Sequence, residues 1–162
     1  MFEHLAAIAA GYLYAILAGH WATSALMRTA WLQVTARLGS TSSADATHPE
    51  HSAAVGLLER ALYMAAWQLG TRDFIGLWLA LKTVGNWKRW TEDTARGTGT
   101  IPGRTSFNLF LLGAGTSLAF GIAGALIADL LDRNDWVHAL LLAAVVAAAP
   151  LGLGTFLRRS RD

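Results

Sequence analysis

The sequence predicts an all-α, polytopic integral membrane protein: a helical bundle of five hydrophobic helices with four or five membrane crossings. Its 162 residues are 54% hydrophobic with a mean hydropathy of +0.37, more apolar than an ordinary soluble domain of this size. Only 15% are charged, and these gather between apolar runs at 5–27, 55–69, 74–84, 107–131 and 136–157. Since about 20 apolar residues span a bilayer, the first, fourth and fifth runs are long enough to cross alone, whereas the middle two are short.

We expect a single transmembrane domain over residues 1–162, with helices at about 2–37, 48–69, 72–90, 105–132 and 136–157 and polar loops at 39–47 and 91–104. The first helix carries Glu3 in place of the basic start of a signal peptide, so we expect it to be retained. Thr47 and Glu50 have the spacing of a capping box at the start of the second helix. Thr71 and Asp135 stand where they would cap the third and fifth helices.

The distribution of basic residues predicts the orientation of the chain. With five crossings, one side of the membrane receives most of them: Arg28, Arg37, Lys88, Arg89, Arg96, Arg104, Arg158, Arg159 and Arg161. The other side receives only Arg72 and Arg133. The positive-inside rule then places the C-terminus in the cytoplasm. If the third helix instead lies on the membrane surface, four crossings result and the cytoplasmic excess remains.

Small residues repeat at helical spacing on two of the long helices. They include Gly11 and Gly19 on the first helix and Gly113, Ser117 and Gly121 on the fourth. Helices in lipid associate through such faces because small side chains allow close backbone approach. Packing within the chain is the favoured interpretation. The alternative is a face for a homo-oligomer or for a partner membrane subunit.

Charged residues inside the middle apolar runs are the main candidates for a functional site. Glu59 and Lys82 each lie 11 residues from a turn at Gly70–Thr71, which puts both about 17 Å deep if the two helices form a hairpin. They are therefore expected to form an intramembrane ion pair, because either charge alone is costly in lipid. Arg60 points about 100° away from Glu59 and needs another partner. The candidates are Asn108, Gln68, Asp129, Asp132 and a lipid headgroup.

These three residues support two main interpretations. In one, Glu59, Arg60 and Lys82 form a satisfied network that fixes the register of the hairpin. In the other, they line a path for an ion, a proton or a small solute. A third interpretation places the hairpin differently and lets the charged side chains extend to the membrane interface.

Other sites are weaker candidates. His20 and His138 could hold a haem if they faced each other across the bundle, although His138 lies only three residues after Asp135. His48, Glu50 and His51 form a weak metal-binding pattern on a polar loop. The chain has no cysteine, no hydrolase motif and no basic–aromatic patch for nucleic acid. We therefore expect no cofactor, no metal site and no nucleic-acid partner, and no enzymatic activity is predicted.

The middle of the chain resembles a block found in small bacterial inner-membrane proteins of unknown function. The block pairs a Gly-x-x-Glu-Arg-x-Leu helix with an Ile-Gly-x-x-x-Ala-x-Lys helix, matched here by Gly56, Glu59, Arg60, Leu62, Gly70, Ile75, Gly76, Ala80 and Lys82. A later Leu-x-Gly-x-x-x-Ser segment is matched by Leu111, Gly113 and Ser117. The resemblance implies a multi-pass protein of the bacterial cytoplasmic membrane and brings no activity with it.

The sequence thus predicts a small membrane protein of transport or accessory type that works in the lipid bilayer as an oligomer or with a partner subunit. Its intramembrane Glu/Arg/Lys cluster would lie at the centre of that function. The alternative is a purely structural subunit of a larger membrane complex. A haem-binding redox protein is the weakest of the three.

Overall fold

The computed structural model describes residues 2–38, 49–92 and 102–159, and these segments contain helices and turns but no strand. The all-α class predicted from the sequence is therefore confirmed. The elements are α1 (Phe2–Leu13), η1 (Tyr14–Ala18), α2 (Gly19–Leu38), α3 (Pro49–Gln68), α4 (Asp73–Glu92), α5 (Gly103–Asp132) and α6 (Trp136–Arg159). The first three form one continuous helix, in which η1 is a single π-helical segment.

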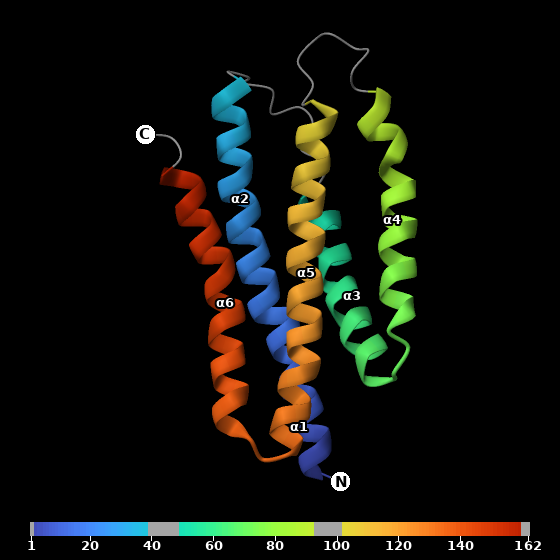
Figure 1. Cartoon of the computed structure of the whole chain (residues 1–162), viewed down its shortest axis with the longest axis vertical. Coiled ribbons are helices and arrows are strands. Elements are labelled where there is room, and N and C mark those ends of the chain that lie inside the picture. The colour runs from blue at the N-terminus through green and yellow to red at the C-terminus, as the bar shows by residue number, and fades with distance from the viewer. Residues whose placement is uncertain (1, 39–48, 93–101, 160–162) are drawn as a thin grey trace.

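The helices stand roughly side by side and alternate in direction (Figure 1). The N-terminal end of α1 and the α5–α6 turn lie at one end of the bundle. The C-terminal ends of α2 and α4 lie at the opposite end, together with the start of α5. The α3–α4 turn lies at neither extreme, because α3 starts partway along the bundle.

Three helices are long and apolar enough to cross a membrane: Phe2–Ala36, Gly103–Asp132 and Trp136–Thr155. These correspond to the three apolar runs that the sequence identified as sufficient alone. α3 and α4 are not among them, so the helical bundle is consistent with a membrane location while five crossings are not established. Large apolar side chains are exposed along α6, among them Val137, Leu140, Leu141 and Val145, as lipid contact requires.

The core is built around α5, which packs against the first helix, α3 and α6. Glycines allow the backbones of α1 and α5 to approach closely. A Cβ atom built on Gly124 would lie 2.7 Å from the carbonyl oxygen of Gly11, a contact that no other residue type could accommodate without movement. On the α3 side, a Cβ atom on Gly121 would lie 2.7 Å from Cβ of Tyr63. The small-residue pattern therefore serves dense packing inside the chain.

Two tight turns connect the antiparallel helices. Gly70, at the α3–α4 turn, has a φ of +72°, a left-handed conformation that glycine adopts without strain. Thr71 was expected to cap the next helix, but its hydroxyl donates back to the carbonyl of Ala66 at 3.4 Å. At the α5–α6 turn, Asp135 behaves as expected, because its Oδ1 accepts from the backbone N–H of His138 at 3.4 Å. Thr47 of the expected capping box lies outside the described residues.

Candidate functional site

Glu59 on α3 and Lys82 on α4 form an ion pair. The carboxylate is 2% exposed, whereas the Lys82 side chain is 23% exposed. Nε1 of Trp78, one turn before Lys82, also donates to Oε1 of Glu59 at 3.3 Å. Lys82 Nζ lies 5.3 Å from the ring centroid of Phe110 on α5, a cation–π distance. The buried carboxylate thus accepts from two donors, Lys82 and Trp78. The Lys82 ammonium in turn contacts the carboxylate and the ring of Phe110.

The hairpin explains why these two residues meet. α3 and α4 run antiparallel from a short turn, and the two residues are separated from that turn by equal lengths of helix. The ion pair between Glu59 and Lys82 that the sequence predicted is therefore present. It joins α4 to α3 at a point where α4 has few other buried side chains, since Ile75 is its one fully buried apolar residue among those described.

Arg60 points away from this pair, into the interface of α2, α3 and α5. It is 1% exposed, and its Nη1 donates to Oγ of Ser117 at 3.3 Å and to Oγ1 of Thr23 at 3.5 Å. Both distances are long for hydrogen bonds and indicate weak contacts. Its Nε has no hydrogen-bond partner within the described segments, and no carboxylate there forms a salt bridge with it.

The four side chains expected as partners of Arg60 were wrong, because among the described residues it binds neither an amide nor a carboxylate: Asn108, Gln68, Asp129 and Asp132 all fail. The reason is geometric: the 100° rotation from Glu59 directs the side chain towards the small-residue faces of α2 and α5, where only hydroxyls are available. Ser117 was expected as a packing residue because it is small, and its hydroxyl adds a polar contact that spacing alone did not indicate.

Two glycines make room for the guanidinium. A Cβ atom on Gly19 would lie 2.6 Å from Cδ of Arg60, so this position on α2 must stay small. A Cβ atom on Gly56, one turn before Arg60, would lie 3.6 Å from both Nη1 and Nη2. At that distance a Cβ atom would make an ordinary van der Waals contact with the guanidinium, so Gly56 lies beside Arg60 on the wall of the same pocket.

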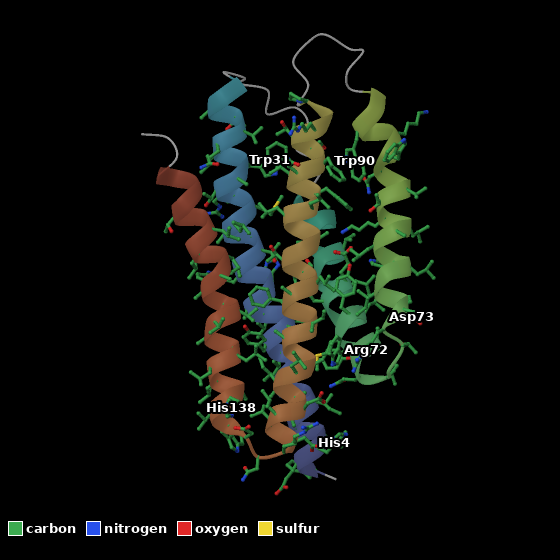
Figure 2. All side chains as sticks on the ribbon, viewed as in Figure 1. His4, Trp31, Arg72, Asp73, Trp90 and His138 are labelled. Carbon is green, nitrogen blue, oxygen red and sulfur yellow. The ribbon has the colours of Figure 1, made fainter. Side chains whose placement is uncertain are left out.

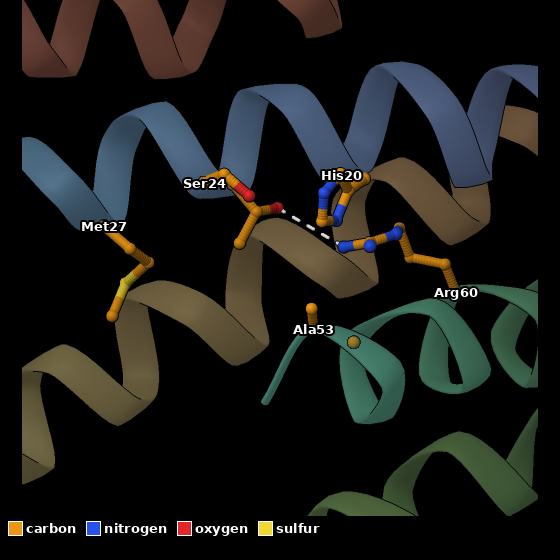
Figure 3. Close-up of a pocket in the computed structure, with 7 residues that line it drawn as sticks. His20, Ser24, Met27, Ala53 and Arg60 are labelled. Atoms are coloured by element: carbon orange, nitrogen blue, oxygen red, sulfur yellow. Dashed lines mark hydrogen bonds between the residues drawn. The ribbon is translucent and has the colours of Figure 1, made fainter. Parts of the chain in front are cut away.

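An open pocket of about 130 Å³ lies beside Arg60 (Figure 3). It is lined from α2 and α3 by His20, Thr23, Ser24, Met27, Ala53, Gly56 and Arg60. Figure 3 shows the Arg60 side chain reaching from α3 towards the α2 residues, with its hydrogen bond to Thr23. The pocket volume exceeds the space that a single water molecule needs, and its wall carries hydrogen-bond donors that a polar ligand could use. This pocket, which combines a buried cation with hydroxyl donors, is the candidate ligand site considered below.

The remaining small-residue candidates lie within the chain. Gly11, Gly19, Ser117 and Gly121 are buried, and Gly113 is half-buried with a Cβ position 3.6 Å from Sδ of Met27. Their small side chains therefore serve contacts between helices of this chain.

The structure does not bring the two candidate haem ligands together. His20 lines the Arg60 pocket, whereas Nδ1 of His138 lies 2.8 Å from Oδ1 of Asp135 at the α5–α6 turn (Figure 2). This hydrogen bond is the main cause that lowers the pKa of the Asp135 carboxyl. No group of three or more potential metal ligands occurs in the described chain. His48 and the side chain of His51 fall outside what the structure describes.

No protein-family model, curated protein or solved structure matches this chain.

Proposed function

We propose that this chain is a transport-type membrane protein that binds a small charged solute beside Arg60, between α2 and α3. We further propose that it works as an oligomer in the cytoplasmic membrane of a bacterium, as the resemblance to small inner-membrane proteins implies. In this proposal all five helices cross the membrane and the C-terminus lies in the cytoplasm.

The observation that carries the proposal is a buried cation beside a pocket. A guanidinium stays charged at any physiological pH, and burying it in an apolar bundle is costly unless the charge is balanced. Arg60 has only two hydroxyl contacts and no salt bridge to a described carboxylate, yet it lines a pocket large enough for a ligand. A purely structural arginine would be expected to have an ionic partner.

The charged cluster then divides into two parts with different roles. Glu59 is satisfied by Lys82 and Trp78 and has no place in the wall of the pocket, so this pair would hold α4 against α3. Arg60 would provide the charge that attracts the solute. In this proposal Glu59 has the structural role that the sequence suggested, and its neighbour Arg60 has the functional role.

The charge distribution supports the proposed orientation. Lys88, in the last turns of α4, and Arg104, at the start of α5, lie at the end of the bundle that contains the C-terminal end of α2, and Arg28 lies midway along α2. Arg72 and Arg133 lie at turns towards the opposite end. An excess of basic residues marks the cytoplasmic side of bacterial membrane proteins.

Flux through reconstituted liposomes tests the proposal. Liposomes containing the purified chain would be given gradients of protons, sodium, potassium, chloride or acetate in turn, with voltage-sensitive and pH-sensitive dyes as readouts. We expect at least one gradient to dissipate faster than in empty liposomes, and Arg60→Gln to remove that difference. Gly85→Leu is the matched control, because Gly85 has open space where its side chain would lie.

If no gradient dissipates faster than in empty liposomes, the transport proposal is wrong. The contacts of Glu59 with Lys82 and Trp78 then favour the alternative, a structural subunit whose charged residues fix the helix hairpin.

A further inference from the structure

The three charged side chains of the α3–α4 cluster do not balance, although only Glu59 and Arg60 are buried and Lys82 is 23% exposed. Glu59, Arg60 and Lys82 contribute one carboxylate and two cations, which leaves one positive charge in excess at neutral pH. The carboxylate is engaged by Lys82 and Trp78, on the side of α3 that faces α4. The excess charge therefore resides on Arg60, on the side that faces α2 and α5.

The pocket wall is suited to a ligand of negative charge. Its polar side chains are the Arg60 guanidinium, the hydroxyls of Thr23 and Ser24, and the imidazole of His20. Every one of these can donate a hydrogen bond, and no carboxylate among the described side chains lines the pocket. A cation would meet no opposite charge here, whereas an anion would meet a buried one.

The shape of the guanidinium narrows the class of anion. Its planar fork forms two parallel hydrogen bonds with carboxylates and related oxyanions, which a spherical halide cannot receive. A Cβ atom at position 56 would lie 3.6 Å from both Nη atoms, so a large side chain there would occupy the part of the pocket beside the guanidinium. A pocket of about 130 Å³ has room for an anion of a few heavy atoms.

We propose that the pocket is a binding site for a small monovalent carboxylate, held by the Arg60 guanidinium with support from Thr23 and Ser24. This ligand would neutralise the excess charge of the buried cluster. This proposal names the class of solute for the transport function proposed above. Only the movement of that solute across the membrane depends on the transport function, because binding can be measured without flux.

Thermal unfolding of the purified full chain in mild detergent tests the site. Sodium acetate would be titrated at constant ionic strength, with sodium gluconate as a bulkier carboxylate and with chloride and inorganic phosphate as other anions. We expect acetate to raise the Tm in a saturable manner and gluconate to leave it unchanged. The Arg60→Gln variant should weaken the apparent affinity for acetate at least about tenfold, since it removes a charge-assisted hydrogen bond.

Gly56→Leu keeps the test valid if Arg60→Gln fails to fold. It leaves the guanidinium in place and fills the approach to it, so acetate should no longer raise the Tm. Gly85→Leu, the same substitution at an uncrowded position of α4, should respond as the original chain does. Equal acetate responses in Gly56→Leu and the original chain would overturn the proposal, as would stabilisation by chloride or phosphate alone.

The two proposals can fail separately. Acetate binding without flux of any ion would leave the site in place and remove the transport function. Flux that depends on Arg60 without acetate binding would keep the function and show that the ligand class is wrong.

Discussion

Glu59 and Arg60 are adjacent in the chain, yet each side chain joins α3 to a different neighbour. Glu59 binds Lys82 on α4, and Arg60 donates to Ser117 on α5 and Thr23 on α2. Successive positions on a helix point about 100° apart, so one helical turn can connect a hairpin and a bundle core. The two contacts should therefore respond independently to mutation.

Because Glu59 is buried and Lys82 is partly exposed, we expect the loss of one partner of this ion pair to reduce stability more than the loss of the other. Lys82→Met leaves Glu59 buried at 2% exposure without its cation, so we expect a loss towards the lower end of about 3–5 kcal/mol. Glu59→Gln should cost less, because Lys82 is 23% exposed and its long side chain can extend to more polar surroundings. The Glu59→Gln, Lys82→Met double variant should be more stable than Lys82→Met alone.

Denaturant unfolding in mixed micelles measures this cycle. Arg104→Met is a control for the loss of an exposed charge and should leave the stability close to that of the original chain. Strictly additive effects of the two single substitutions would show that the pair is not energetically coupled.

Close packing of α1 against α5 predicts that Gly11 tolerates no larger side chain. A Cβ atom there would lie 2.8 Å from Cε of Met64 and 3.0 Å from Cβ of Ala128, and it would also meet the backbone of Gly124. Because a backbone cannot move aside, Gly11→Ala should cost about 1–3 kcal/mol. Gly85→Ala makes the same chemical change where nothing lies within 4 Å, and should cause no loss. Thermal unfolding of the two variants compares them, and similar losses would argue against the α1–α5 contact.

Hydropathy was sufficient to identify the helical class and the three long apolar helices, since both depend on local composition. The meeting of Glu59 and Lys82 also followed from the sequence, because a hairpin fixes its own register by counting residues from the turn. The surroundings of Arg60 could not be predicted in this way. They depend on how α2 and α5 approach α3, which is decided by glycines and small residues far away in the chain.

The difference between contacts within a hairpin and contacts among several helices also explains which other contacts the sequence did not predict. Trp78 as a second donor to Glu59 requires the angle between α3 and α4, and the contact between Tyr14 and α6 requires the arrangement of the whole bundle. The spacing of His138 from Asp135 already separated it from His20 in sequence, and in the structure Asp135 holds His138 at the helix end. Local spacing therefore predicted contacts within a hairpin and failed for contacts among three helices.

The half-buried Tyr14 and the buried Tyr63 predict opposite outcomes for the same substitution. The hydroxyl of Tyr14 donates to the carbonyl of Ala143 on α6 at 2.8 Å, so Tyr14→Phe should cost about 0.6 kcal/mol, the average for interhelical hydrogen bonds in membranes. The buried hydroxyl of Tyr63 has no partner among the described residues, so Tyr63→Phe should be neutral or stabilising. Denaturant unfolding of both variants provides the comparison. A loss at Tyr63 equal to that at Tyr14 would indicate a partner for its hydroxyl.

The number of membrane crossings is predicted to be five, and the absence of native cysteine makes this accessible to labelling. Single cysteines would replace Leu69, exposed at the α3–α4 turn, and Arg133, exposed at the α5–α6 turn, with Arg104 marking the other end of the bundle. Leu69 is preferred to Gly70, whose left-handed φ of +72° would strain a cysteine. A membrane-impermeant maleimide added to the outside of intact cells should label positions 69 and 133 and spare position 104.

Labelling at 133 without labelling at 69, even after the membrane is permeabilised to the reagent, would place the α3–α4 turn within the bilayer. In that case α3 and α4 would enter and leave by the same side, and the ion pair between them would anchor a re-entrant hairpin.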